Sequence, residues 1–543
     1  MKLWYIYTWN GASGVVLTWA SLTTAQQNAL VDTAAGESTF VNAQKRLLWL
    51  AGDQTNEDGV LLRKRTTLLG DIVNSDPVYA GAEDRGYTSL PASVPGQNTY
   101  AAYVASKKTR TPIIAVGAND GMLHIFKSSD GTELFAFMPS TAIMKAIALT
   151  RPSYGATINP HQYFVNGSMY VDDVYISGAW RTYLFGAMGS GGQAVFALDI
   201  SNPDSMTASN IKFEMTNVDN SHVGYVLGQP QIAFLADGTW SAVFGNGYNS
   251  GDDRAYLMVV DLSNKSNTTT VATNSGSSNG LAGPELLMRA DGTIATAYAG
   301  DLLGNLWKFD LSSTNRSDWA IAYGQPLFIA RSSSGAVQPI TSTPNLGFNF
   351  QNGNKVMVYF GTGQYFATGD NIVTGTTVQS FYGIEDVGPI TSTDRSQLWP
   401  KTWGLDSQNR RAVIETQVDW SVKKGWYLDF DTTLGERVIT SALLAYDQLI
   451  FPTFIPSQNA CSFGGSGELV DTSGVNGTSF VPIIGQSVVQ LAVAVIKTPA
   501  YIESGSKIYF PSSNLQGNSG GLPTGTPPPV AGQKGRVSWR QLK

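Results

Sequence analysis

Short hydrophobic segments, each interrupted by glycine, asparagine or aspartate, recur along the chain. Each copy begins with Gly, continues through a few turn residues and reaches an aromatic or aliphatic pair before ending in Asp or Phe. The copies are Gly117–Phe126, Gly186–Asp199, Gly245–Asp261, Gly300–Phe309 and, more loosely, Gly361–Phe366. Runs of branched and aromatic residues separated by such turn residues are typical of paired strands. Each copy therefore predicts a β-hairpin.

A second set of β-type segments lies upstream of these hairpins. They surround Ile72–Tyr79, Gln231–Leu235, Thr343–Phe348 and Ser441–Leu449. Together the two sets give roughly four strands per repeat and a period of roughly 50–70 residues, which is typical of propeller blades. The sequence thus predicts an all-β fold, a β-propeller of six to seven four-stranded blades with short helical insertions.

The composition divides the chain into three parts. Residues 1–68 form an N-terminal helical and strand segment packed on the propeller, residues 69–516 form the propeller, and residues 517–543 form a Gly/Pro-rich linker with a terminal SWRQL. Helix formers across Leu22–Leu50 predict two short helices, with Ser21 or Thr23 and then Thr39 as N-caps.

Two further segments interrupt the strand pattern inside the propeller. Ser140–Leu149 predicts a helix between blades, because its apolar and small residues are good helix formers. The polar run Ser263–Asn279 predicts an exposed insertion, since it has too few apolar residues to be buried.

Charge and cysteine content exclude several classes of protein. Only 14% of the residues are charged, the net charge is -6 and the isoelectric point is about 5.2, so a nucleic-acid-binding surface rich in Lys and Arg is not expected. The single Cys461 cannot form an intramolecular disulfide, and the three histidines, His124, His161 and His222, are too scattered for a zinc site.

Neither the start of the chain nor its most apolar stretch predicts export or membrane insertion. The opening residues lack an apolar core and a small-residue cleavage site, so no signal peptide is predicted. Phe480–Ile496 is the most apolar stretch, but Pro482, Gly485 and Gln486 interrupt it, and it is too short to cross a bilayer. We therefore expect no transmembrane segment.

Several phrases are more specific than propeller patterning requires. They are LGDIVNSDPVYAG (Leu69–Gly81), GANDGMLHIF, YAGDLLGNLWKFDL (Tyr298–Leu311), TFIPSQNACSFGGSGEL (Thr453–Leu469) and SWRQL (Ser538–Leu542). From about Ile6 onward, the chain resembles the C-terminal β-propeller of the PilC/PilY-type proteins of the type IV pilus tip.

The resemblance implies a non-enzymatic protein of the bacterial surface, located at the pilus tip or associated with the outer membrane. It implies roles in pilus assembly, retraction control and adhesion, with minor pilins and host or abiotic surfaces as partners. Such proteins usually carry a signal peptide and a large N-terminal region, so the resemblance also implies that this chain is a fragment or a reduced homologue.

The resemblance further implies a calcium loop just before the YAGDL phrase, with alternating acidic ligands. Counting back from Tyr298, the ligand positions hold Leu287, Arg289, Asp291, the carbonyl of Thr293, and Ala295. One carboxylate beside an arginine cannot replace the several oxygen ligands that Ca²⁺ requires. We therefore interpret Asp291-Gly292 as a metal-free hairpin turn.

Other acidic residues are interpreted as structural. The pairs Asp172-Asp173, Asp237-Gly238 and Asp252-Asp253 suit strand-joining turns, and Asp301 is expected to cap its own turn. No full calcium-loop string occurs in the sequence. We expect no catalytic, cofactor-binding or metal-ligating residue.

Three other motifs favour structural interpretations. Ala51-Gly52-Asp53 lies where related sequences can present Arg-Gly-Asp, but the cation is absent, so integrin binding is not expected. Cys461 has no neighbouring His or Lys to lower its pKa and is interpreted as an inert thiol. Gly186–Gly192 lacks the Lys-Ser/Thr of a phosphate loop and predicts a hairpin.

The thirteen tryptophans could pack between blades or form a sugar-binding platform. Those at strand-like positions favour packing, because large aromatic side chains fill the space between sheets. This group includes Trp180, Trp240, Trp307 and Trp426.

Two functions compete with the pilus-tip role. A quinoprotein-type dehydrogenase shares Trp-rich blades, but it needs a quinone, calcium ligands and an Asp base, and no such set is assembled in the sequence. A periplasmic scaffold for outer-membrane assembly is the other alternative.

Overall fold

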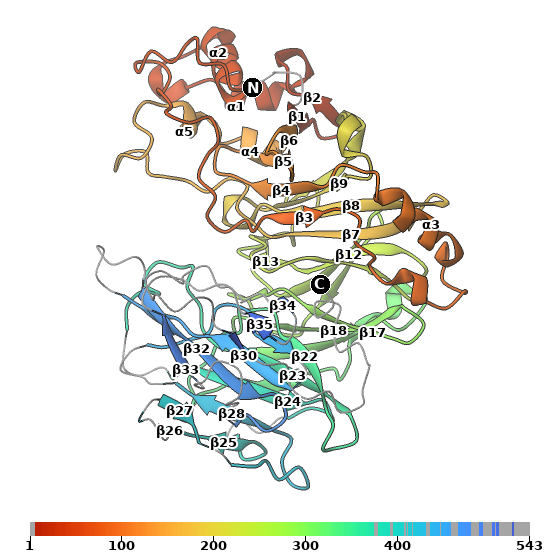
Figure 1. Ribbon diagram of the computed structural model, residues 1–543. Helices are drawn as coiled ribbons and strands as arrows, with labels where there is room; N and C mark the ends of the chain where they lie inside the picture. Colours follow the sequence, from red (N-terminus) through yellow and green to blue (C-terminus); the bar gives the residue numbers. More distant parts are fainter. Residues whose placement is uncertain are drawn as a thin grey trace.

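The computed structural model describes residues 6–373, 378–390, 395–406, 409, 411–414, 416–430, 435–445, 447–457 and 465–478, together with four later strands. Cys461, the C-terminal SWRQL and most of Phe480–Ile496 lie outside the described residues. Six sheets of four to six strands follow one another along this part of the chain, and Figure 1 shows them as successive layers. The predicted β-propeller fold is confirmed.

The sheets are built from consecutive strands, as propeller blades are. Blades 1 to 3 contain the following strands: β3 (Val78–Ala80), β4 (Ile113–Gly117), β5 (Leu123–Lys127) and β6 (Glu133–Met138); β7 (Met169–Ile176), β8 (Ala179–Ala187), β9 (Ala194–Asp199) and β10 (Ile211–Thr216); β11 (Gln231–Phe234), β12 (Trp240–Gly245), β14 (Tyr256–Asp261) and β15 (Thr268–Ala272).

Blades 4 to 6 follow the same order and add short extra strands. They contain β17 (Glu285–Met288), β18 (Ile294–Gly300), β19 (Asn305–Asp310), β20 (Ala320–Ile321) and β21 (Phe328–Ile329); β22 (Asn345–Asn349), β23 (Lys355–Gly361), β24 (Ser380–Glu385), β28 (Gly425–Asp429) and β25 (Trp399–Lys401); β29 (Leu443–Ala445), β30 (Gln448–Pro452), β32 (Gly465–Ser473), β31 (Ile455–Pro456) and β33 (Val488–Leu491).

Three smaller sheets of the described residues lie outside these blades. They are β13 (Gly247–Tyr248) with β16 (Gly280–Leu281), β26 (Trp403–Leu405) with β27 (Arg411–Val413), and β34 (Ile502–Ser504) with β35 (Lys507–Tyr509) and β36 (Thr524–Gly525).

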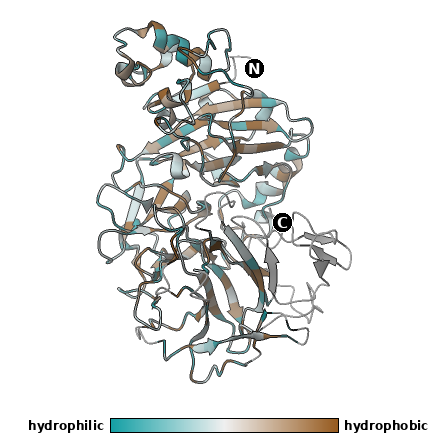
Figure 2. Cartoon of the chain, turned by 90° about the vertical axis from the view of Figure 1, so that its left-hand side faces the viewer, coloured by the Kyte–Doolittle hydropathy of each residue, from teal (hydrophilic) through white to brown (hydrophobic). Residues whose placement is uncertain are grey.

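The first strands of successive blades are neighbours. Strand β7 lies beside β3 and β11, and β22 lies beside β17 and β29. The first strands β3, β11, β22 and β29 fall within or next to the upstream segments that the sequence predicted, whereas β7 and β17 were not predicted. Aromatic pairs fill the space between blades, with ring centroids 5.4 Å apart for Phe137–Phe196 and 3.9 Å apart for Phe381–Phe451. In Figure 2 the strands are largely hydrophobic, while many of the connecting loops are hydrophilic.

The N-terminal segment is continuous with the first blade. Strand β1 (Ile6–Trp9) pairs in parallel with β6, and β2 (Gly14–Val16) pairs with β1. Helices α1 (Thr24–Ala29) and α2 (Phe40–Leu50) lie at the same end of the molecule (Figure 1). Their N-caps are Thr23 and Thr39, as the sequence predicted.

Short helices lie within the first blade and between the first two blades. One helix was predicted over Ser140–Leu149, but the structure has two short helices there, α4 (Ser140–Ile143) and α5 (Ile147–Thr150). Helix α3 (Gln97–Lys107), between β3 and β4, was not predicted.

The polar run Ser263–Asn279 was wrongly predicted to be an exposed insertion. Its residues Thr268–Ala272 form β15, which pairs with β14 at the edge of blade 3 and buries Val271. The β-branched threonines suit such an edge strand, in which one face packs and the other meets water.

The glycine that opens each sequence copy lies at or next to the end of the second strand of its blade. Its φ lies outside the left-handed region at all five copies. A Cβ at Gly300 would lie 2.1 Å from Ile340 Cγ2, and a Cβ at Gly361 would lie 2.2 Å from Val438 Cβ. Glycine is therefore required at these two positions by the close approach of the segment that leads to the next blade.

Hydrogen bonds fix the same crossings. The amides of Val165, Ile340 and Val438 donate to the carbonyls of Ala118, Asp301 and Thr362, at 3.3, 3.0 and 2.9 Å. Each acceptor directly follows a recurring glycine. At these three copies the repeat in the sequence thus marks the point at which one blade is attached to the next.

We predict that Gly300→Ala lowers the free energy of unfolding by about 1–3 kcal/mol, because the added methyl overlaps Ile340 in a packed core. Denaturant unfolding measures this change. Gly276→Ala is the matched control, since a Cβ there meets only one atom, at 4.0 Å, and is expected to have little effect. Equal stability of the two variants would contradict the crowding at Gly300.

Candidate functional site

The turn at the implied calcium loop joins β17 to β18. Arg289 N donates to Thr293 O at 2.8 Å, and Gly292 has a φ of +79°. Asp291 Oδ1 accepts from Thr293 N at 3.0 Å and from Thr293 Oγ1 at 2.6 Å. These hydrogen bonds from Thr293, and to a lesser degree the nearby Arg289, lower the pKa of Asp291.

The residues of this turn do not fit a calcium ion. Leu287 and Ala295 offer no side-chain oxygen, and the Thr293 carbonyl already accepts the hydrogen bond that closes the turn. Gly292 is packed so closely that a Cβ would lie 2.6 Å from Leu90. Within the described residues, no group of three or more His, Cys, Asp or Glu is placed to hold a metal ion.

The two other acidic turns are partnered by the protein itself. Asp237 Oδ1 accepts from Thr239, and its Oδ2 is 2.5 Å from Arg316 Nε. Asp252 accepts from the Tyr256 hydroxyl and lies 3.4 Å from His222 Nδ1. The turn at Asp237 joins β11 to β12, and the turn at Asp252 joins β13 to β14, as the sequence predicted.

Asp172 and Asp173 do not lie in a turn, and that interpretation was wrong. They occupy the middle of β7, where Asp173 is fully buried. Lys107 Nζ, at the end of α3, lies 2.5 Å from Asp173 Oδ2. The branched and aromatic residues on both sides of the pair in MYVDDVYI are those of a strand, and that pattern could have located the pair correctly.

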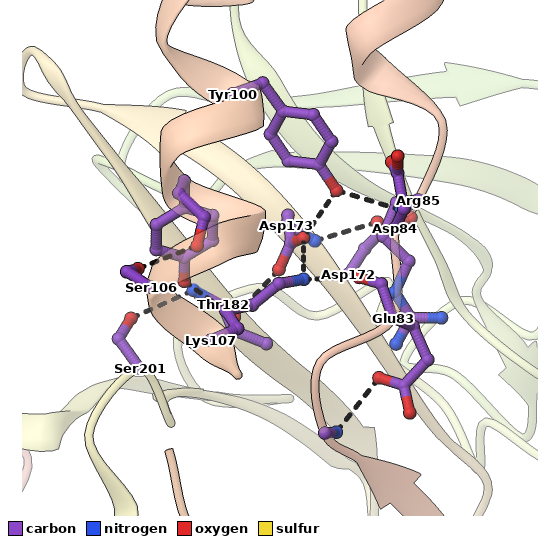
Figure 3. A network of polar contacts seen from close by, with 12 residues as sticks. Glu83, Asp84, Arg85, Tyr100, Ser106, Lys107, Asp172, Asp173, Thr182 and Ser201 are labelled. Atoms are coloured by element: carbon purple, nitrogen blue, oxygen red, sulfur yellow. Dashed lines mark hydrogen bonds and ion pairs between the residues drawn. The ribbon is translucent and has the colours of Figure 1, made fainter. Parts of the chain in front are cut away.

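Figure 3 shows how the network around Asp173 joins α3 to blade 2. The Tyr100 hydroxyl donates to Asp173 Oδ2 at 2.7 Å, and Thr182 Oγ1 donates to Asp173 Oδ1 at 2.8 Å. Burial, followed by the charge of Asp173, raises the pKa of Tyr100, so its phenol remains a donor. Burial alone would lower the pKa of Arg85. The negative charges of Asp172 and Asp173 have the larger effect, so the pKa of Arg85 is raised.

Asp301 caps its own turn, as predicted. Its carboxylate accepts from Asn305 N at 2.9 Å, from the indole of Trp307 at 2.8 Å and from Asn279 Nδ2 at 3.0 Å. A buried carboxylate with this many donors is stabilised as a structural element.

The tryptophans at strand-like positions are core residues. Trp180, Trp240, Trp307 and Trp426 are at most 7% exposed, which confirms the packing interpretation for these four. Gly186–Gly192 spans the β8–β9 hairpin, as predicted. Asp53 follows α2 and accepts from Thr55 N at 2.8 Å.

The comparison with known proteins decides the family. The profile described as the PilY1 beta-propeller domain matches residues 69–397. The chain belongs to the PilY1 β-propeller family.

Curated relatives from the PilY1 family extend the match beyond the profile. The type IV pilus biogenesis factor PilY1 of Pseudomonas aeruginosa (strain PAK) is 34% identical over 506 residues, covering 84% of this chain and 43% of that protein. A PilY1 homolog of Xylella fastidiosa is 36% identical over 466 residues, covering 83% of this chain and 36% of the relative. The chain thus spans less than half the length of these relatives.

A solved structure from the PilY1 family has the same fold. The crystal structure of the Pseudomonas aeruginosa PilY1 C-terminal domain aligns with a TM-score of 0.66 and 28% identity, covering 80% of this chain and 97% of that domain. No helix in the described part of the chain is long and apolar enough to cross a membrane.

We predict that Lys107→Met destabilises this PilY1-family propeller by about 3–5 kcal/mol, because it removes the ammonium that is paired directly with the buried Asp173 carboxylate. Lys265→Met is the matched control, since its partner Asp219 is exposed and such pairs contribute about 0–1 kcal/mol. Urea unfolding followed by tryptophan fluorescence compares the two. Similar losses from both variants would show that the buried pair has no special role.

We also predict that calcium does not bind at the β17–β18 turn. Calorimetric titration should give the same result for the wild type and Asp291→Asn, because the amide oxygen of the substituted side chain would still accept from Thr293. A calcium-dependent rise in melting temperature that Asp291→Asn abolishes would contradict the metal-free turn.

Proposed function

We propose that the chain is the propeller region of a non-enzymatic type IV pilus biogenesis factor at the bacterial surface. The match to PilY1 proteins carries this proposal, because identity of 34% extends over 84% of the chain and the family profile matches residues 69–397. The relatives bear the name of pilus biogenesis factors.

Within this general assignment, the specific role that we propose is the binding of partners. We propose that the propeller binds minor pilins at the pilus tip and surface ligands outside it, and thereby supports assembly, retraction control and adhesion. A rigid stack of blades suits this role, because loops on such a scaffold present fixed binding surfaces. The buried acids Asp173 and Asp301 are bonded to several donors of the protein itself, which favours a structural role for them over a catalytic one.

The proposal is tested by co-purification from a bacterium with type IV pili. The tagged protein in its natural full length should recover minor pilins, and sheared pilus fractions should contain it. The major pilin subunit serves as the control prey. Recovery of a barrel-assembly complex without minor pilins would favour the scaffold alternative.

The enzymatic alternative has its own test. Purified protein incubated with calcium, pyrroloquinoline quinone and an alcohol should not reduce a dye acceptor. Turnover that depends on the quinone would overturn the non-enzymatic assignment.

A further inference from the structure

A cavity of about 250 Å³ lies between the N-terminal segment and blade 1. We call it the Arg63 cavity; its walls include Trp49, Arg63, Arg65, Asp71, His124 and Tyr154. No sequence motif pointed to it, because its walls come from segments up to about a hundred residues apart.

Hydrogen bonds hold the wall of the Arg63 cavity nearest the propeller. Gly70 N donates to Asp120 Oδ2 at 2.8 Å, and Asn119 Nδ2 donates to Asp71 Oδ2 at 2.9 Å. The segment that enters blade 1 is thereby attached to the β4–β5 turn. The wall is fixed before any ligand arrives.

Arg63 is held in place by groups that leave the end of its side chain free. Its guanidinium carbon lies 4.8 Å from the ring centre of Tyr154 and 5.4 Å from that of Trp49. Its Nε donates to Leu149 O at 3.1 Å. The two terminal nitrogens have no hydrogen-bond acceptor within the described residues, although they belong to a side chain that lines the cavity.

The neighbouring charges are already paired. Arg65 Nε lies 2.6 Å from Glu57 Oε1, and its guanidinium stacks 3.7 Å from the centre of the Trp49 ring. His124 lies between Asp120 and Glu133. Burial alone would lower the pKa of His124, but these two carboxylates outweigh it and raise the pKa to about 10.

Among the positive side chains that line the cavity, those of Arg63 and the exposed Lys64 therefore remain unpaired. Neither has a carboxylate partner in the part of the chain that the structure describes. A planar guanidinium with two free NH₂ groups matches the two oxygens of a carboxylate. Asp71 and Asp120 also line the cavity and would repel a doubly charged phosphate more strongly than a singly charged carboxylate.

We propose that the Arg63 cavity binds the carboxylate of a small ligand, with the terminal nitrogens of Arg63 donating to its two oxygens. The volume is below the roughly 300–1,000 Å³ of pockets for drug-sized ligands, so it suits one acidic sugar residue or one acidic side chain. This inference is independent of the pilus assignment.

The test is calorimetric titration of the whole chain with four probes at pH 7. D-glucuronate represents an acidic sugar and N-acetylglutamate amide an acidic side chain, while D-glucose and inorganic phosphate are the controls. We expect at least one carboxylate to bind at millimolar concentration, and the one that binds identifies the source. Binding of neither carboxylate, or equal or tighter binding of glucose or phosphate, would overturn the proposal.

Variants locate the binding in the cavity. Arg63→Gln should weaken binding at least tenfold, and Arg63→Lys should weaken it less, because a lysine keeps the charge without the paired donors. Arg289→Gln, on the exposed β17–β18 turn, is the matched control and should bind as the wild type does.

A second variant keeps the proposal testable if Arg63→Gln fails to fold. Thr67 is exposed and lines the same cavity, so Thr67→Trp should fill the cavity without removing any contact of Arg63. Loss of carboxylate binding in a folded Thr67→Trp protein supports the site. Undiminished binding in Thr67→Trp, or in a folded Arg63→Gln protein, would show that the carboxylate binds elsewhere.

Discussion

The segment that leaves one blade crosses the second strand of that blade so closely that no side chain fits between them. At these crossings Ile340 and Val438 occupy the volume that a side chain on Gly300 or Gly361 would need. The amide of each crossing residue donates to the carbonyl that follows the glycine. Packing and hydrogen bonding are therefore satisfied by the same few atoms, and the position of each blade depends on the one before it.

The helical insertion between β3 and β4 adds a second connection between blades. Its α3 residues Tyr100 and Lys107 bind Asp173 in blade 2, and its Leu90 contacts the β17–β18 turn of blade 4. The insertion thus reaches several blades at once. Its buried charges are neutralised within the protein, as burial in a medium of low polarity requires.

These two features favour a scaffold over a reactive site. The acidic residues that a catalytic interpretation would use are engaged by Lys107, Trp307 and Arg316, which hold separate parts of the chain together. Groups that remain free, such as the terminal nitrogens of Arg63, lie at the edge of the propeller. The buried acidic residues of the described blades thus belong to the contacts that hold the propeller together.

The sequence predicted the strands well because alternation and turn residues are local signals. It also located the cap at Asp301 and the buried tryptophans, since both follow from the residue type and its position in a strand. Helix α3 was missed because only Tyr100 and Lys107 of its eleven residues are buried, which leaves no apolar stripe to recognise. Other features depend on contacts between distant residues. Asp173 meets Lys107 across 66 positions, and the Arg63 cavity forms only when the N-terminal segment folds onto blade 1. The recurring glycines were recognised but interpreted as turn residues, although at Gly300 and Gly361 the reason is the crossing segment that leads to the next blade. No local pattern distinguishes these two reasons.

Native-state hydrogen exchange at the amides of Val165, Ile340 and Val438 tests the attachment of blade to blade most directly. If the crossings hold the propeller together, these three amides should be as protected as those of the central strands and should exchange in one common unfolding step as denaturant is added. Exchange of the three amides at separate, lower free energies, while the strands remain protected, would contradict that dependence.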